Sequence, residues 1–177
     1  MAIQISSDGR TFTLQTEKSS YQMMADAHDV LLHLYYGRKI AAENLEERIF
    51  RSDVGFAGNP PEAGEDRTYS LDVLPQELPG SGVGDYREDM VRLYHADGSC
   101  AADFRFESYE VQEGAYRIPG LPAAYDTGEE KGETLVITMR ETASAVKVKL
   151  YYGVFEKENV ITRTVCIENQ GKEAVIL

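Results

Sequence analysis

The sequence has 177 residues, of which 42% are hydrophobic. This length allows one domain with a well-buried core, and this apolar content excludes a disordered chain. Thirty acidic residues against 18 basic ones give a formal net charge of -12, which repels phosphate backbones and anionic lipid headgroups. We therefore expect neither nucleic acid nor a membrane surface as a partner.

The N-terminal residues MAIQISSDGR have neither the basic segment nor the apolar core of a secretory signal, and no apolar run in the chain approaches ~18 residues. The two cysteines, Cys100 and Cys166, lie far apart and show no CxxC or Cys/His spacing. Two reduced thiols are typical of a cytoplasmic protein. The sequence thus predicts a cytoplasmic location, no metal and no cofactor.

The first part of the chain predicts antiparallel sheet. Asp8-Gly9 tolerates the positive φ of a tight hairpin turn and is flanked by residues rich in β-branched and aromatic side chains. Four strands are expected here, at residues 3–6, 11–16, 20–26 and 30–37. Ala42–Phe50 is the one stretch that shows a helical pattern.

Further strands follow in the second half. Asp97-Gly98 predicts a hairpin that joins residues 90–95 to residues 100–114. Residues 145–158 alternate with period two, which indicates a half-buried strand, and residues 158–169 form its hairpin partner. One face of the former carries Val146, Val148, Leu150, Tyr152 and Val154, and the opposite face carries Lys147 and Lys149.

Many strands, frequent turns and little helix predict an all-β fold, a large antiparallel β-sandwich (a supersandwich) with long connecting loops. We expect residues 1–177 to form a single sandwich domain. Residues 173–177 begin another apolar strand that stops without a polar cap. We therefore expect the chain to be a piece of a longer polypeptide.

The segment Glu65–Asp89 is longer than an ordinary connection and needs a reason to exist. Its carboxylates alternate with Leu71, Leu74, Leu78 and Tyr86. Apolar side chains in a loop must be covered, either by the chain's own sheets or by another subunit or domain. The residues alone favour the chain's own sheets.

Acid–base chemistry has no clear sequence signal. His28, His33 and His95 have no metal-ligand spacing, and neither GxSxG nor HExxH occurs, so the histidines are expected to be structural. Glycoside hydrolysis needs two carboxylates ~5 to ~9.5 Å apart, but thirty acids make some such pair unavoidable. Tryptophan is absent, so a stacking platform for sugars is not indicated.

The order of several long motifs is nevertheless specific. Five stretches resemble the N-terminal domain of bacterial α-galactosidases of glycoside hydrolase family 36: HLYYG (33–37), SDVGFAGNP (52–60), DRTYSLDVLPQELPGSGVGDYR (66–87), LPAAYDTGEEKGETLVITM (121–139) and YYGVFEKENVITRTVCIENQG (151–171). The resemblance implies a β-sandwich that precedes a (β/α)8 barrel. The barrel would carry both catalytic aspartates of a retaining mechanism, and its motifs do not occur in this chain, so no catalytic residue is expected here.

The resemblance also implies roles for the loops, because enzymes of this family are commonly homotetramers in which a sandwich loop reaches a neighbouring active site. Asp53 matches the substrate-binding aspartate of that loop, although the following Val54-Gly55 departs from the bulkier or basic residues of the family. An interface and loop-bracing set is expected at Asp66, Arg67, Asp72, Gln76 and Glu77. With the resemblance, Glu65–Asp89 is interpreted as a surface shaped against protein outside the chain.

The expected partners are therefore the catalytic barrel of the parent chain, neighbouring subunits of a homo-oligomer, and a galactoside substrate of the melibiose or raffinose type. The alternative is an autonomous carbohydrate-binding or protein-interaction β-sandwich with no enzyme attached. A continuing reading frame that encodes a barrel would separate the two hypotheses.

Overall fold

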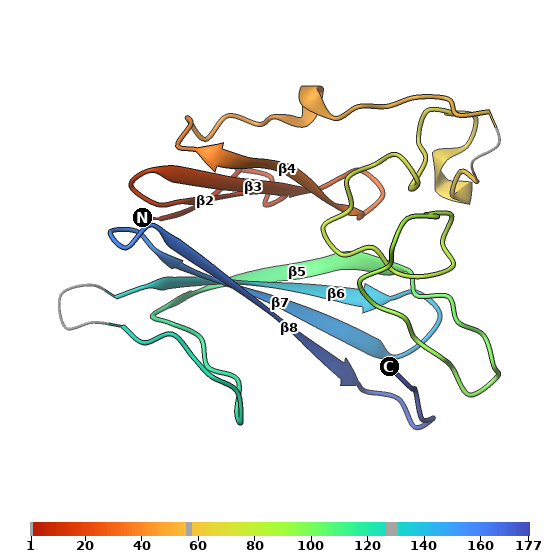
Figure 1. The fold of residues 1–177 in the computed structure, drawn as a ribbon. Coiled ribbons are helices and arrows are strands. Elements are labelled where there is room, and N and C mark those ends of the chain that lie inside the picture. The colour runs from red at the N-terminus through yellow and green to blue at the C-terminus, as the bar shows by residue number, and fades with distance from the viewer. Residues whose placement is uncertain (1, 56–57, 127–130) are drawn as a thin grey trace.

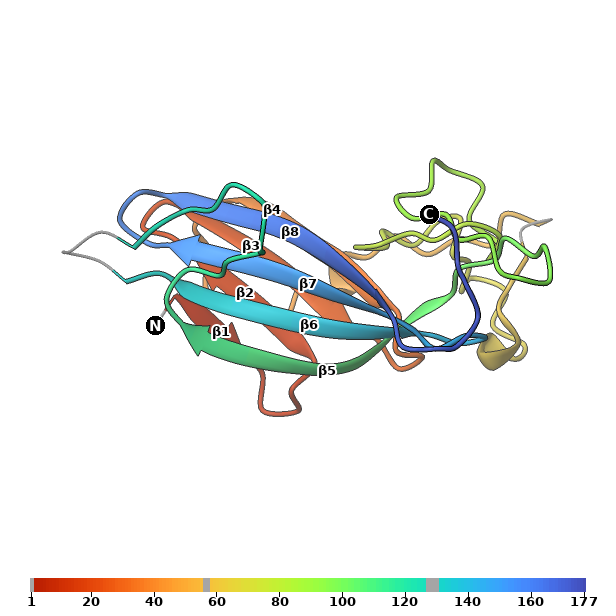
Figure 2. The ribbon, with the colours of Figure 1, turned by 90° about the horizontal axis from the view of Figure 1, so that it is seen from below.

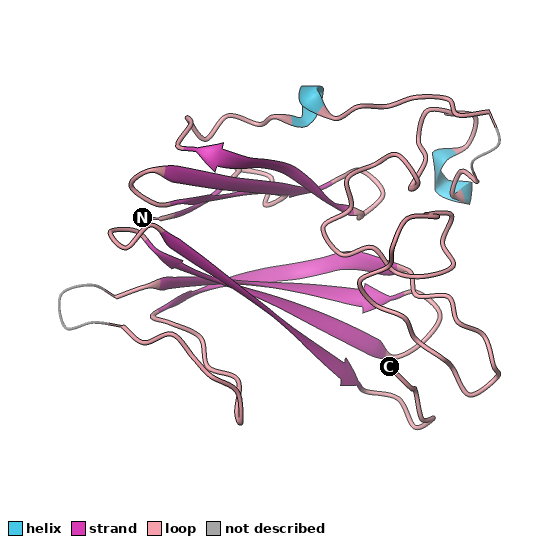
Figure 3. Cartoon of the chain, in the orientation of Figure 1, coloured by secondary structure: helices cyan, strands magenta, loops and turns pink. Residues whose placement is uncertain are grey.

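The computed structural model describes residues 2–55, 58–126 and 131–177 (Figure 1). Within these residues the strands form two four-stranded antiparallel sheets that face each other as two layers (Figures 1 and 3). The N-terminal sheet contains β1 (Ile3–Ile5), β2 (Thr11–Gln15), β3 (Ser19–Ala25) and β4 (Leu31–Arg38). The C-terminal sheet contains β5 (Phe104–Glu113), β6 (Glu133–Glu141), β7 (Val146–Phe155) and β8 (Val160–Asn169). The predicted antiparallel β-sandwich is confirmed.

Each sheet keeps its strands in chain order, and every neighbouring pair is antiparallel. The predicted Asp8-Gly9 turn is present, with Gly9 at φ +71° and its N–H donating to Ser6 O over 2.9 Å. The pairing of β3 with β4 shifts register between Gln22 and Met23, where Leu34 of β4 has no partner. The side chains of β3 still alternate, so Met23 belongs to the core between the sheets, whereas Met24 belongs to a second cluster.

The main core lies between the two layers. Phe12 and Leu14 of β2 are fully buried there, together with Val148 and Leu150 of β7. The period-two pattern predicted for residues 145–158 is confirmed, because Val146, Val148, Leu150, Tyr152 and Val154 are all buried. Burial of each large apolar side chain contributes about 1.5–3 kcal/mol, so this interface holds the two sheets together.

Two local predictions were wrong. Asp97-Gly98 does form a turn, with the His95 N–H donating to Ser99 O over 2.9 Å, but the flanking residues do not form a hairpin. Instead β5 pairs with β6, and residues 90–95 make only isolated bridges, Val91 to Gly80 and Tyr94 to Ile176. A turn motif fixes the local backbone but does not select the pairing partner of the strands beside it. The expected strand at residues 173–177 is likewise reduced to the single bridge at Ile176.

The expected helix at Ala42–Phe50 is only the 3-10 turn η1 (Glu46–Arg48), and a second turn, η2 (Pro61–Ala63), follows. Neither turn has a buried residue or a side-chain cap, so no tertiary packing stabilises a longer helix. No helix in the described part of the chain is long and apolar enough to cross a membrane.

A long connecting segment (residues 39–103) joins β4 to β5. It runs over the outer side of the N-terminal sheet and then gathers beyond one end of the strands, where the last residues of the chain also lie (Figures 1 and 2). Its Tyr69, Leu71 and Leu74 form a second buried cluster with Met24 and Leu32 of the sheet. The segment is therefore anchored on the sandwich by an apolar contact of its own.

Candidate functional site

Asp53 lies in the first part of the connecting segment, which we call the strap (residues 39–55). Arg67 binds the Asp53 carboxylate with two donors, Nε to Oδ2 over 2.8 Å and Nη2 to Oδ1 over 3.3 Å. The Gly55 N–H donates to Oδ1 over 2.8 Å. The hydrogen bond from Arg67 holds the pKa of Asp53 below its usual value, so the carboxylate is ionised at neutral pH.

This carboxylate is open to solvent. The side chain of Asp53 is 44% exposed, and that of Arg67 is 66% exposed. A carboxylate offers about four lone-pair positions, so three hydrogen bonds leave acceptor capacity for an external donor. The pair thus presents a fixed anionic acceptor at the surface, which suits the hydroxyl groups of a sugar.

Asp66 shapes the turn that carries Arg67. Its Oδ1 accepts hydrogen bonds from Thr68 N over 2.9 Å and from Thr68 Oγ1 over 2.6 Å. The Thr68 hydroxyl lowers the pKa of Asp66 below its usual value. Asn59 fixes the same turn from across the loop, because its Nδ2 donates to Asp66 O over 2.9 Å and to Tyr69 O over 2.7 Å.

Asp72 and Gln76 contact the second half of the loop. Asp72 Oδ1 accepts a hydrogen bond from Tyr86 N over 2.9 Å, and Gln76 Nε2 donates to Asp85 Oδ2 over 2.8 Å. Asp85 also pairs with Arg87 over 2.8 Å. These contacts all lie within residues 72–87 and hold the two halves of the loop together. Neither Asp72 nor Gln76 touches the Asp53–Arg67 pair through any hydrogen bond among the described residues.

Glu77 lies in a different environment, between the two sheets, with only 3% of its surface exposed. Its carboxylate accepts hydrogen bonds from the hydroxyls of Tyr21 and Tyr152, both over 2.7 Å. His33 Nδ1 lies 3.4 Å from Oε2, and Arg163 Nη1 lies 3.3 Å from Oε1. Burial acts to raise the pKa of Glu77, but these donors outweigh it, so the pKa lies below its usual value.

Of the two roles expected for its set, interface and loop bracing, the burial of Glu77 fits loop bracing. A side chain enclosed within its own chain cannot present a carboxylate to a neighbouring subunit. Its backbone is fixed as well, because its N–H donates to Leu31 O over 2.8 Å and its carbonyl accepts from Arg163 Nη2 over 2.8 Å. Glu77 therefore braces the loop against both sheets.

The apolar residues of Glu65–Asp89 also face inward. Leu71, Leu74 and Leu78 are buried against the sandwich, whereas Tyr86 is 75% exposed. The interpretation of the whole run as a surface shaped against outside protein was thus wrong for its leucines, because Leu71 and Leu74 pack on the outer side of the N-terminal sheet and Leu78 packs in the core between the sheets. Tyr86 is the one of these four side chains that stays uncovered.

The histidines make structural contacts. The His28 ring packs edge-on against Tyr69, with centroids 4.6 Å apart, and His95 Nε2 lies 2.9 Å from Ala101 O. Cys100 and Cys166 are both free thiols. Across the described ranges, no group of three or more His, Cys, Asp or Glu side chains could hold a metal ion.

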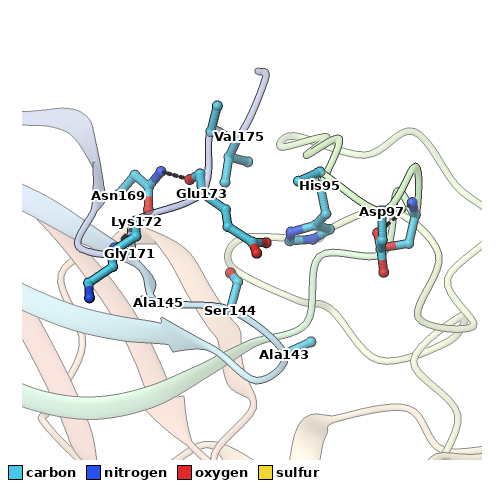
Figure 4. A pocket seen from close by; sticks show the side chains of 13 residues that line it. His95, Asp97, Ala143, Ser144, Ala145, Asn169, Gly171, Lys172, Glu173 and Val175 are labelled. Carbon is cyan, nitrogen blue, oxygen red and sulfur yellow. Dashed lines mark hydrogen bonds between the residues drawn. The ribbon is translucent and has the colours of Figure 1, made fainter.

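A cavity of about 320 Å³ lies near the C-terminal end of the chain, between the turn at residues 95–99, the β6–β7 turn and residues 169–175 (Figure 4). The side chains of His95 and Glu173 point toward each other across it (Figure 4). Asn169 Nδ2 donates a hydrogen bond to the backbone oxygen of Glu173 over 2.8 Å. None of the predicted site residues lines this cavity.

Residues 29–177 match the family model described as the glycosyl hydrolase family 36 N-terminal domain. The chain is 45% identical over 171 residues to the bifunctional alpha-galactosidase/sucrose kinase AgaSK of Mediterraneibacter gnavus. This alignment covers 97% of the present chain and 18% of AgaSK. It is 34% identical over 177 residues to the alpha-galactosidase AgaA of Geobacillus stearothermophilus. This alignment covers 100% of the present chain and 24% of AgaA. The chain thus spans less than a quarter of the length of these curated relatives.

Solved structures give the same result. The galactosidase domain of AgaSK superposes with a TM-score of 0.93 at 44% identity, over 98% of this chain and 24% of that one. A variant of AgaA from Geobacillus stearothermophilus, crystallised in complex with raffinose, superposes with a TM-score of 0.86 at 36% identity, over 94% of this chain and 23% of that one.

Proposed function

Because this chain belongs to the family of glycosyl hydrolase family 36 N-terminal domains, we propose that it is the non-catalytic sandwich domain of a longer α-galactosidase. The resemblance inferred from its motifs is confirmed by this membership. The parent enzyme hydrolyses terminal α-galactosides such as melibiose and raffinose. A separate (β/α)8 barrel in the parent chain supplies the two aspartates of a retaining mechanism.

The observation that carries a role in substrate binding is the geometry of Asp53. Arg67 and the Gly55 N–H hold its carboxylate ionised and oriented, yet almost half of the side chain stays exposed. An ionised carboxylate accepts hydrogen bonds from vicinal sugar hydroxyls without a proton of its own. In the proposed assembly, Asp53 makes this contact in the active site of a neighbouring subunit.

The proposed partners are the barrel of the parent chain and other copies of the parent chain. These copies form a homo-oligomer, which we propose is a tetramer. Exposed Tyr86, and the loops that gather beyond one end of the strands, support a surface for such contacts. The free thiols of Cys100 and Cys166 support a cytoplasmic location.

Two measurements test this function. The 177-residue chain should show no turnover of an aryl α-galactoside, whereas a protein that continues past residue 177 into a barrel should hydrolyse it. In that longer enzyme, Asp53→Ala should raise KM for raffinose about tenfold while thermal unfolding stays unchanged, because one charge-assisted hydrogen bond to substrate is lost. Wild-type KM in the variant would remove Asp53 from the site, and turnover by the short chain would contradict the placement of the chemistry.

A further inference from the structure

The strap is attached to the N-terminal sheet by polar side chains. Gln15, Ser20 and Gln22 lie on the outward side of β2 and β3, where solvent-facing residues are normally found, yet all three are buried. The residues that alternate with them, Leu14 and Tyr21, pack in the core between the sheets. The strap covers these polar groups, so each needs a hydrogen-bond partner within the chain.

Gln22 makes two hydrogen bonds to the strap, whereas Gln15 and Ser20 make one each. Its Nε2 donates to Glu43 O over 2.8 Å and to Thr13 Oγ1 over 2.8 Å. Its Oε1 accepts from Leu45 N over 3.1 Å. The side-chain amide therefore binds one carbonyl and one N–H of the strap, as a further strand of the sheet would do.

A second contact fixes the start of the strap. Gln15 Nε2 donates to Ile40 O over 2.7 Å, and Ser20 Oγ accepts from Ile40 N over 3.1 Å. The Lys39 N–H donates to Lys18 O over 2.8 Å. Residues 39–45 are thus held on the sheet by one backbone hydrogen bond and by side chains that bind backbone atoms of the strap.

The strap then runs to Asp53 through a short series of contacts. The Arg48 N–H closes η1 on Leu45 O over 2.9 Å, and Ile49 packs against the second apolar cluster. The Arg51 guanidinium lies 5.5 Å from the centroid of the Tyr69 ring. Leu45, whose N–H is bound by Gln22, is therefore the N-terminal end of the turn that leads to Asp53.

We propose that Gln22 is a positioning residue for Asp53: its buried side-chain amide anchors the strap on the sheet and so fixes where the Asp53 carboxylate meets the substrate. Gln22 touches neither the substrate nor the reacting atoms. This inference rests on the proposed function of Asp53 in substrate binding.

The test compares Gln22→Met with Gln4→Met. Methionine keeps the volume of Gln22 but leaves Glu43 O and Leu45 N without their partner. Gln4 lies on β1 of the same sheet and is exposed, and its Nε2 donates to Gln15 Oε1 over 3.1 Å; its loss removes no hydrogen bond to the strap, because Gln15 holds Ile40 O through Nε2. Leu45→Pro provides a second variant, because it deletes the N–H from the strap and leaves the sheet unaltered.

Hydrogen exchange in the 177-residue chain provides the first measurement. In Gln22→Met and Leu45→Pro, exchange over residues 40–55 should rise about tenfold, because one lost hydrogen bond changes a local opening equilibrium by that order. Exchange in β2 and β7 should not change, and Gln4→Met should behave as the wild type. Unchanged exchange over residues 40–55 in both strap variants would overturn the inference.

Kinetics of the longer enzyme provide the second measurement. Gln22→Met should raise KM for raffinose several-fold with kcat within about twofold, and it should add nothing to the KM of Asp53→Ala in the double variant, because neighbouring residues in one chain of contacts are not additive. Additive effects, or an unchanged KM alongside a raised KM in Asp53→Ala, would overturn the role of Gln22 alone. A wild-type KM in Asp53→Ala would instead overturn the proposed function, and the positioning role with it.

Discussion

The hydroxyl of Tyr152 donates a 2.7 Å hydrogen bond to Oε1 of Glu77, and both residues are buried. Tyr152 belongs to β7 of the C-terminal sheet, and Tyr21 of the N-terminal sheet binds the same oxygen over 2.7 Å. One loop carboxylate thus joins the two layers of the sandwich. The connecting segment that carries the candidate site is fixed to both sheets at this point.

Glu77→Gln should lower the free energy of unfolding by about 3 kcal/mol, because an amide removes the buried charge that pairs with Arg163 and turns an N–H₂ group toward the donors Tyr21 and His33. Urea denaturation followed by circular dichroism measures this change.

Glu113→Gln is the matched control for this substitution. Glu113 pairs with Lys131 at the surface, where both side chains are more than 70% exposed. Its loss should change stability by less than about 0.5 kcal/mol. Equal effects of the two substitutions would show that the carboxylate of Glu77 does not hold the sheets together.

The stability of the chain should also depend on pH through Glu77. Its pKa in the folded chain lies below the usual 4.5 because of His33, Arg163 and the two tyrosines, against the opposing effect of burial. The unfolded chain therefore binds this proton more readily, and acid favours unfolding. The contribution of Glu77 is complete above pH 4.5 and is lost as pH falls through the lower folded pKa.

Urea denaturation of the wild type and Glu77→Gln at several pH values isolates this contribution from that of the other carboxylates. The difference in unfolding free energy between the two proteins should be constant near neutral pH and should shrink as pH falls below 4.5. A difference that stays constant down to pH 3 would contradict the lowered pKa.

The sequence predicted the sheets because their signals are local. The Asp8-Gly9 turn fixes its hairpin, and the alternation of residues 145–158 fixes which face of β7 is buried. Pairing across a long gap has no such signal, which is why residues 90–95 were wrongly paired with residues 100–114. The Asp97-Gly98 motif predicts a turn but does not indicate which strand pairs with its flanking residues.

The site was predicted less completely for the same reason. Tyr21, Tyr152 and Arg163 are 56, 75 and 86 residues from Glu77, so no spacing in the sequence could place them together. Gln22 stands at an outward strand position, where a glutamine is typical of a solvated face, and only the path of the strap shows that it is buried. Asp53 could be named only through the resemblance, because an aspartate in a loop is unremarkable alone.

Arg67→Ala should raise the pKa of Asp53 toward its usual 3.8, because the hydrogen bond from Arg67 is the largest cause of the lowered value. Carbon-13 NMR titration of the aspartate carboxyls measures this shift. Arg67→Lys keeps the charge but not the two-donor geometry, so it should restore only part of the shift.

Arg92→Ala is the control for this titration. Arg92 makes the same two-donor contact with Asp89, over 2.8 and 2.9 Å, three residues away in the chain. Its loss should raise the pKa of Asp89 and leave that of Asp53 unchanged. An unchanged Asp53 titration in Arg67→Ala would show that the guanidinium does not set the ionisation of the site.

Gly80→Ala should destabilise the fold by about 2 kcal/mol, because the end of the loop passes too close to its neighbour for a side chain. A Cβ at Gly80 would lie 1.8 Å from the Ala102 carbonyl oxygen, which belongs to the backbone that leads into β5. Gly58 lies in the same connecting segment, where a Cβ would meet nothing within 4 Å, so Gly58→Ala should change stability by less than about 0.5 kcal/mol. Thermal unfolding of both variants measures the contrast. If Gly80→Ala were as stable as Gly58→Ala, the loop could shift away from Ala102 at no cost, and the close packing of Glu77–Gly80 on the sandwich would not be what fixes the connecting segment.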